Sequence, residues 1–278
     1  MKFGLALPYG DALRTARFAQ RAEAAGWDGC FVGDSIWGVD PIVALTAAAM
    51  LTTRIRLGIM IVPMPLRKPW KVASETAALD NLSGGRLILG LGAGAVWMGW
   101  KGFPDEVTDT KARAEMLDET IDILTGMYLG KPFDYEGKHF RIKLTLLEEQ
   151  HYPPRPVQQP RIPLWVVGVW PRKHSMQRAL KGDGLLPGKM NSAGQFEPIT
   201  PADVREMRDY VNTHRALTNP FDIIIEEQSL GWEAAKIQDK LGQWQEAGAT
   251  WWVEGLWGAS ETDVLARIEQ GPPRIPNS

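Results

Sequence analysis

The chain has 278 residues, of which 44% are hydrophobic and 23% are charged, and it carries a formal net charge of −2. This balance is typical of a globular protein with a sizeable core and argues against a disordered chain. Because its 31 basic and 33 acidic side chains form no long run of one sign, nucleic acids and anionic membranes are not expected as partners.

No feature of the sequence indicates export, a disulfide or a metal. The first apolar run ends at Pro8, too early for a signal peptide, and no later run reaches the ~18 apolar residues of a membrane span. Cys30 is the single cysteine and lies in an apolar stretch, so we expect a buried thiol. The four histidines lack ligand spacing. We therefore expect a cytoplasmic protein with no metal site.

Short apolar runs alternate with segments of helical period, as in parallel strands joined by crossover helices. Strands are predicted at Lys2–Leu7, Asp28–Gly33, Ile55–Val62, Arg86–Leu91, Pro163–Gly168, Gly184–Pro187, Phe221–Gln228 and Thr250–Glu254. Helices are predicted at about 11–25, 40–52, 69–82, 108–127, 173–181, 200–215, 232–247 and 260–269. Gly26 and Gly248 can end two of these helices in the left-handed conformation.

Eight such units can form a closed barrel or an open doubly wound sheet, and the number of units favours closure. We predict a single (β/α)₈ barrel over residues 1–270, with 271–278 as a proline-containing surface tail. The connection after the fourth strand, about 93–162, is longer than the others. It contains a hairpin pattern over 133–141, and long connections of this kind often carry function.

The active site of a parallel barrel lies at the carboxyl ends of its strands. Six of the 12 tryptophans are predicted there: Trp37, Trp70, Trp97, Trp100, Trp170 and Trp257. Such a group predicts a pocket for a large flat ligand or a bulky apolar substrate. The alternative is that these rings close the barrel top against loops or a partner subunit. Trp165, Trp244, Trp251 and Trp252 fall within predicted elements and are expected in the core.

A glycine-rich segment follows the fourth strand. Gly90, Gly92 and Ala95 match the spacing of a dinucleotide-binding fingerprint, but that fingerprint opens a helix, whereas here a loop continues to about residue 108. We expect Gly92 and Gly94 to leave backbone exposed so that a ring system can approach. The alternative is that these glycines only relieve crowding between neighbouring strands.

Two charged residues at predicted strand ends are candidates for ligand contact. Lys189 could pair with a ligand phosphate, form a Schiff base in a lyase, or be an ordinary surface lysine. Asp34 could accept a hydrogen bond from a cofactor, or cap the following helix.

Several segments, in this order, resemble those of one enzyme family. They are Phe3–Pro8, Ala22–Asp28, Arg54–Gly58, Ser74–Arg86, Leu89–Gly94 and the hairpin Tyr135–Phe140. With them the chain resembles the luciferase-like flavin-dependent oxidoreductases, which include FMN monooxygenases and enzymes that use the deazaflavin coenzyme F420. The stretch Leu-Asp-x-Leu-Ser-Gly-Gly-Arg, followed by Leu-Gly-x-Gly, is the most specific part.

The resemblance implies a (β/α)₈ barrel that binds FMN or F420 at its mouth, with a non-proline cis peptide at Met60–Ile61. By position, the cofactor-binding residues would be Asp34, Met60, Ile61, Ala93, Gly94, Gly168, Val169, Gly188 and Lys189. It also implies a small apolar or aromatic substrate, with a monooxygenase as the expected form of the enzyme. The resemblance further implies a separate flavin reductase or F420-reducing enzyme as a partner. It also implies that the protein can form a homodimer.

The sequence departs from the sugar-phosphate dehydrogenases of this family, which have His after the aspartate and Glu after the second glycine. Ser35 and Ala95 stand at these positions, so no general base is evident. The catalytic residue is therefore unknown, and the candidates for substrate contact are Ser35, Trp37, Trp97 and Arg172. A non-catalytic flavin-binding protein remains an alternative.

Overall fold

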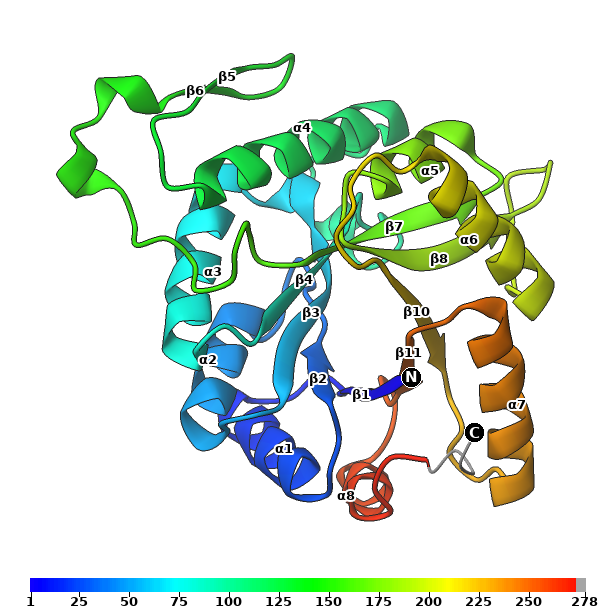
Figure 1. Cartoon of the computed structure of the whole chain (residues 1–278). Coiled ribbons are helices and arrows are strands. Elements are labelled where there is room, and N and C mark those ends of the chain that lie inside the picture. The colour runs from blue at the N-terminus through cyan, green and yellow to red at the C-terminus, as the bar shows by residue number, and fades with distance from the viewer. Residues whose placement is uncertain (274–278) are drawn as a thin grey trace.

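The computed structural model describes residues 1–273, and eight parallel strands in it close into a barrel (Figure 1). The strands are β1 Lys2–Ala6, β2 Gly29–Val32, β3 Arg56–Pro63, β4 Leu87–Gly92, β7 Leu164–Trp170, β8 Gly184–Met190, β10 Asp222–Glu227 and β11 Trp251–Gly255. β11 pairs with β1 and β8 pairs with β10, so the ring has no free edge. Closure is confirmed, and an open sheet is excluded.

The helices lie outside the ring (Figure 1). They are α1 Ala12–Ala24, α2 Pro41–Leu51, α3 Pro69–Ser83, α4 Thr110–Tyr128, α5 Lys173–Ala179, α6 Pro201–His214, α7 Ala234–Ala247 and α8 Glu261–Glu269. Each predicted helix is present. Asp11 and Asp109 accept hydrogen bonds from backbone N–H groups at the starts of α1 and α4, while Gly26 and Gly248 follow α1 and α7 with φ of 93° and 106°.

Two strands run two or more residues further than predicted. β7 continues to Trp170 and β8 to Met190, and β8 also pairs with a short antiparallel strand, β9 Phe196–Glu197. A two-residue strand has no period that sequence can show. The longer strands place Gly188 inside the sheet rather than in a loop, and Gly168, predicted as the last residue of its strand, two residues before the end of β7.

The long connection after β4 forms α4 and then an arm that leaves the barrel (Figure 1, upper left). Its predicted hairpin is confirmed as antiparallel β5 Asp134–Glu136 and β6 Arg141–Lys143. The Glu119 carboxylate of α4 accepts the backbone N–H groups of Lys138 and Phe140 and so fixes the hairpin to the helix. The division of the chain at residue 270 stays a prediction, and the last part of the predicted tail, 274–278, lies outside the described residues.

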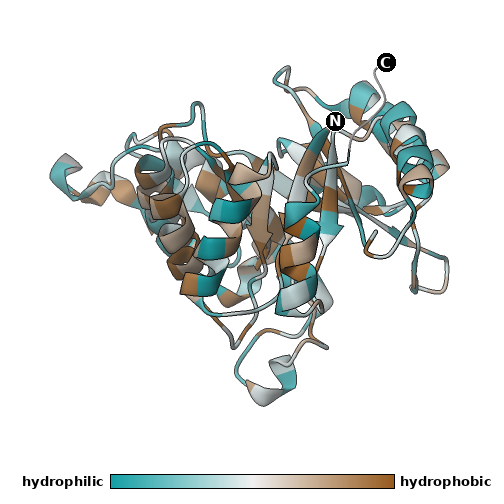
Figure 2. Ribbon diagram, turned by 90° about the horizontal axis from the view of Figure 1, so that it is seen from below, coloured by the Kyte–Doolittle hydropathy of each residue, from teal (hydrophilic) through white to brown (hydrophobic). Residues whose placement is uncertain are grey.

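Hydrophobic residues are concentrated in the strands, whereas the helices carry both kinds of residue (Figure 2). The main core fills the space between strands and helices, and it includes Trp244 and Trp252, as expected. A second cluster lies inside the ring. In it, the Phe31 ring lies 5.2 Å from that of Trp165 and 5.8 Å from that of Trp251.

Glycines on three neighbouring strands make room for Phe31. A Cβ atom at Gly4, Gly29 or Gly58 would come within 2.7, 2.8 or 2.5 Å of this ring. Trp165 and Trp251 lie near the amino ends of β7 and β11, so these rings fill the lower half of the barrel. These three rings do not fill the other half of the barrel, which opens at the carboxyl ends of the strands.

Phe31→Ala is expected to lower the free energy of unfolding by about 3–5 kcal/mol, because it leaves a cavity between two buried indoles. Urea unfolding followed by far-UV circular dichroism measures the change. Leu146→Ala on the arm, where the leucine is 80% exposed, should change it by less than about 0.5 kcal/mol. Equal losses in the two variants would contradict this role for Phe31.

Candidate active site

Two hollows open at the carboxyl ends of the strands. Their volumes are about 680 and 630 Å³. They adjoin each other and share six lining residues: Asp34, Ile61, Trp97, Met98, Val167 and Phe196. We call the first the central hollow, which lies over the barrel lumen, and the second the lateral hollow, which extends toward α4 and α5. A space of this size is typical of a small-molecule or cofactor site.

The residues Met60 and Ile61 of β3 line the central hollow, and their peptide bond is cis, as predicted. The register between β3 and β4 jumps from Ile59 to Val62, so neither residue has a partner on β4. Pairing with β2 also ends at Ile59. Neither residue therefore has a register partner on β2 or β4, and the regular sheet is interrupted where both line the hollow.

The glycines of β4 make room for the irregular segment Met60–Ile61 of β3. This corrects the expectation that Gly92 exposes backbone to a ligand. A Cβ atom at Gly90 would lie 2.6 Å from the Ile59 carbonyl oxygen, and one at Gly92 would meet the Ile61 side chain. Gly92 therefore relieves crowding between strands and does not expose backbone to a ring. Gly94 has a φ of 76° and lies against Trp100, while still lining the lateral hollow. As predicted, no helix opens directly after this motif.

Asp34 follows β2 and makes a two-point ion pair with Arg67. Its Oδ2 accepts from Nε at 2.6 Å and its Oδ1 accepts from Nη2 at 2.9 Å. Burial raises the pKa of Asp34 while Arg67 opposes that shift, and Asp34 in turn raises the pKa of Arg67. Asp34 does not cap the next helix, because Asp40 accepts the N–H groups at the start of α2. Asp34 thus lines both hollows with a carboxylate whose position Arg67 fixes.

Lys189 of β8 lines the central hollow and pairs with Asp203 of α6 at 2.9 Å. Asp203 also accepts from Thr200 in the capping box of α6, so its position is fixed. The hydrogen bond to Asp203 raises the pKa of Lys189. A Schiff-base lysine needs the opposite shift, so this environment disfavours a lyase.

Arg113 of α4 is a site residue that the sequence reasoning missed. Its Nη1 donates to the carbonyl oxygens of Ala93 and Gly94 at 3.0 and 2.8 Å, and its guanidinium lies 5.3 Å from the Trp100 ring. Burial lowers its pKa, and its Nε has no hydrogen-bond partner within residues 1–273. No local pattern marks Arg113, because only the course of the 93–109 loop brings it to the lateral hollow.

Eight of the nine predicted cofactor residues line the two hollows: Asp34, Met60, Ile61, Ala93, Gly94, Val169, Gly188 and Lys189. Gly168 does not line either hollow, since a Cβ atom at this position would point toward Leu185 and Met176. Of the substrate-contact candidates, Ser35 and Trp97 line the lateral hollow. Trp37 is 85% exposed and Arg172 donates to the Asn191 carbonyl oxygen, and neither lines a hollow.

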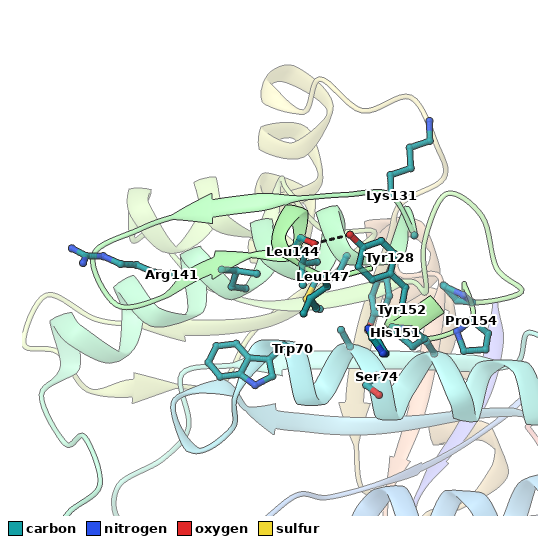
Figure 3. A pocket seen from close by; sticks show the side chains of 17 residues that line it. Trp70, Ser74, Tyr128, Lys131, Arg141, Leu144, Leu147, His151, Tyr152 and Pro154 are labelled. Atoms are coloured by element: carbon teal, nitrogen blue, oxygen red, sulfur yellow. Dashed lines mark hydrogen bonds between the residues drawn. The ribbon is translucent and has the colours of Figure 1, made fainter. Parts of the chain in front are cut away.

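Three of the six tryptophans predicted at the mouth line its hollows, and three do not. Trp97, Trp100 and Trp257 line the hollows. Trp170 instead donates to Glu206 of α6 at 3.0 Å. Trp70 begins α3 and packs against Phe140 of the arm, at one end of a separate pocket of about 370 Å³ (Figure 3). The walls of the mouth are therefore mainly aliphatic, with indoles only at its rim.

Tyr9 and Glu226 also line the central hollow, and neither was predicted there. Glu226 is the next-to-last residue of β10, where the acidic pair Glu226 and Glu227 gave no indication of which side chain points inward. Within residues 1–273 no cluster of three or more His, Cys, Asp or Glu residues could hold a metal. Cys30 is buried, which raises the pKa of its thiol to about 12.

Residues 1–218 match the family model described as luciferase-like monooxygenase. The chain belongs to this family. A putative coenzyme F420-dependent oxidoreductase of Mycobacterium tuberculosis is 36% identical over 153 residues, which are 52% of this chain and 42% of that protein. The 4-hydroxyprotoasukamycin monooxygenase of Streptomyces nodosus subsp. asukaensis is 36% identical over 119 residues, 41% of this chain and 32% of that one. Each match thus spans less than half of the relative's length.

The fold of the family extends over the whole barrel. The F420-dependent tetrahydromethanopterin reductase of Methanopyrus kandleri aligns with a TM-score of 0.72 at 19% identity, over 97% of this chain and 98% of that one. This match shows that the two chains share one fold over nearly their whole lengths.

Lys189 is expected to resist Schiff-base trapping, because Asp203 keeps its ammonium group protonated at neutral pH. Incubation with acetone and borohydride, followed by peptide mass spectrometry, should leave Lys189 unmodified. The exposed Lys111 reports non-specific labelling in the same digest. An adduct at Lys189 in clear excess over Lys111 would overturn the assignment.

Proposed function

We propose that this protein is an oxidoreductase that binds a flavin-type cofactor, FMN or F420, in the adjoining hollows and reduces or oxygenates a small apolar or aromatic substrate beside it. The observation that carries the proposal is the pair of adjoining hollows at the mouth, one of which is lined by Met60 and Ile61, where the register between β3 and β4 is interrupted. The family membership and the two 36% identical relatives, one named for F420 and one as a monooxygenase, support it.

The residues present fit such a cofactor. A flat ring needs apolar contact on its faces and polar contact on one edge. Ile61 and Val167 line both hollows and offer the apolar surface, and the backbone at Met60–Ile61, where the register is interrupted, would offer polar contact. Lys189 is a protonated partner for a phosphate, and the buried Nε of Arg113 still lacks an acceptor. Ala93, Gly94, Val169 and Gly188 complete the proposed cradle, while Gly168 would act only through its backbone.

When bound, the reduced cofactor supplies two electrons, either together with dioxygen or as a hydride. The protein would hold the ring, exclude water and orient the substrate. Arg67 fixes the Asp34 carboxylate at the edge of both hollows, so this anion can orient a donor group of the ligand without moving. Ser35 and Trp97 stand where a substrate over the ring would meet the loops.

Further parts of the proposal concern partners. No helix within residues 1–273 is long and apolar enough to cross a membrane. We place the protein in the cytoplasm, with a separate flavin reductase or F420-reducing enzyme as the electron source. For a homodimer, supporting evidence comes from α2, which is apolar around its whole circumference yet leaves Val43 59% and Met50 68% exposed.

Calorimetric titration with FMN and with F420 tests the proposal. Wild-type protein should bind at least one of them, and Val167→Trp should weaken that binding at least ~10-fold, or about 1.4 kcal/mol, by filling the wall shared by the hollows. Leu146→Trp on the arm should bind like wild type. Binding of neither cofactor by wild type, or full binding by a folded Val167→Trp variant, contradicts the proposal.

Oxygen uptake separates the two forms of redox chemistry. A monooxygenase loaded with reduced cofactor should consume one equivalent of dioxygen for each substrate oxygenated, measured with an oxygen electrode and product mass. An enzyme that transfers hydride should turn over equally well without oxygen. Product formed anaerobically at an undiminished rate would rule out the monooxygenase.

A further inference from the structure

Glu226 is a carboxyl group at the mouth that the proposed cofactor contacts do not use. On β10, Ile224 belongs to the cluster inside the barrel, while Ile223 and Ile225 belong to the outer core. The strand alternation therefore turns Glu226 inward and Glu227 outward. Glu226 lines the central hollow, and Glu227 instead accepts a hydrogen bond from Trp244 of α7 at 3.0 Å.

The Glu226 carboxyl is held at one oxygen and free at the other. Trp257, which follows β11, donates its indole N–H to Oε1 at 2.5 Å. Within residues 1–273 no donor reaches Oε2. Gly255 leaves room beside this group, since a Cβ there would lie 3.0 Å from Oε1. The carboxyl is thus fixed in orientation with one oxygen available to a bound molecule.

The surroundings of Glu226 shift its titration upward. Its side chain is exposed and borders the central hollow, and the apolar residues Met60, Leu186 and Ile224 line the same hollow. Desolvation raises the pKa of Glu226, although the Trp257 hydrogen bond partly opposes the shift. A carboxyl with a raised pKa holds its proton to higher pH, which favours a role as general acid.

The other ionisable groups that line the central hollow are already engaged or are poor acids. They are Tyr9 after β1, Asp34 after β2, Lys189 on β8 and Glu197 on β9. Asp34 is held by Arg67 and Lys189 by Asp203. Glu197, like Glu226, accepts one hydrogen bond, from Asn191, but it lies on β9, which is not part of the closed ring of strands. Burial raises the pKa of Tyr9 above its ordinary value, so it holds its proton more tightly. Glu226 is left as the group best suited to exchange a proton.

We propose that Glu226 is the general acid of this enzyme and protonates the oxygen of a small ketone or aldehyde bound in the central hollow. The inference rests on the proposed function in its hydride-transfer form. The carbonyl carbon gains a hydride from the reduced cofactor, the carbon–oxygen π bond breaks, and its electron pair goes to oxygen. That oxygen takes the proton of Glu226, giving an alcohol and an oxidised cofactor, and the carboxylate regains a proton from water. The acid thus replaces the His and Glu absent at Ser35 and Ala95.

The protonation of Glu226 can be measured without any cofactor. In protein made with isotope-labelled glutamate carboxyl groups, NMR titration should show one signal, missing in Glu226→Gln, with a pKa above the ordinary value of about 4.3. Trp257→Phe should raise this pKa further, because it removes a hydrogen bond that favours the carboxylate. Glu227→Gln is the matched control and should leave the signal in place. An ordinary pKa for Glu226 overturns the inference.

Turnover is tested with the reduced cofactor that binds and with cyclohexanone, acetone and benzaldehyde. Wild-type kcat should fall as pH rises through the Glu226 pKa, since the acid must be protonated. Glu226→Gln should lower kcat at least ~100-fold without changing cofactor affinity, and Trp257→Phe should move the pH limb upward. Glu227→Gln should behave as wild type.

The outcomes separate the two proposals. If neither FMN nor F420 binds, the proposed function fails whatever the NMR titration shows. If wild type binds a cofactor but reduces none of the three carbonyl compounds, the substrate class is wrong. If Glu226→Gln turns over like wild type, Glu226 is not the acid.

Discussion

The structure depends on how the barrel lumen is filled. Phe31, Trp165 and Trp251 occupy the lower half, and glycines on β1, β2 and β3 allow the strands to close around the phenylalanine ring. Large rings at the amino ends of the strands give the barrel a packed floor. The upper half is consequently open, and the ends of the strands surround a space large enough for a cofactor and a substrate.

The same division explains which parts of the architecture could be predicted. Parallel strands buried on both faces give continuous apolar runs, and caps such as Asp109 and stops such as Gly248 mark the helix ends, so the order of elements was readable. The short strand β9 and the extension of β8 were not, because their pairing is a tertiary event. Closure followed from the number of units rather than from any single segment.

The candidate site was predictable where it follows directly from strand ends. Asp34 and Lys189 line the central hollow as predicted from the strand ends, whereas Ile61 could be named only from the family resemblance. What they contact was not predictable, since Arg67 and Asp203 come from other units. Trp70 shows the limit most clearly: it follows β3 in sequence, but the first turn of α3 directs it to the arm. Glu226 was missed because one residue of register decides which of two adjacent glutamates faces inward.

The central claim is that the adjoining hollows seat the ring of a flavin-type cofactor against Met60–Ile61. A crystal structure of the protein with FMN or F420 tests it most directly. The account predicts ring density over this segment, with the phosphate near Lys189 and with the opposite face open toward Glu226. A ring bound elsewhere, for example in the pocket beside Trp70, would contradict it.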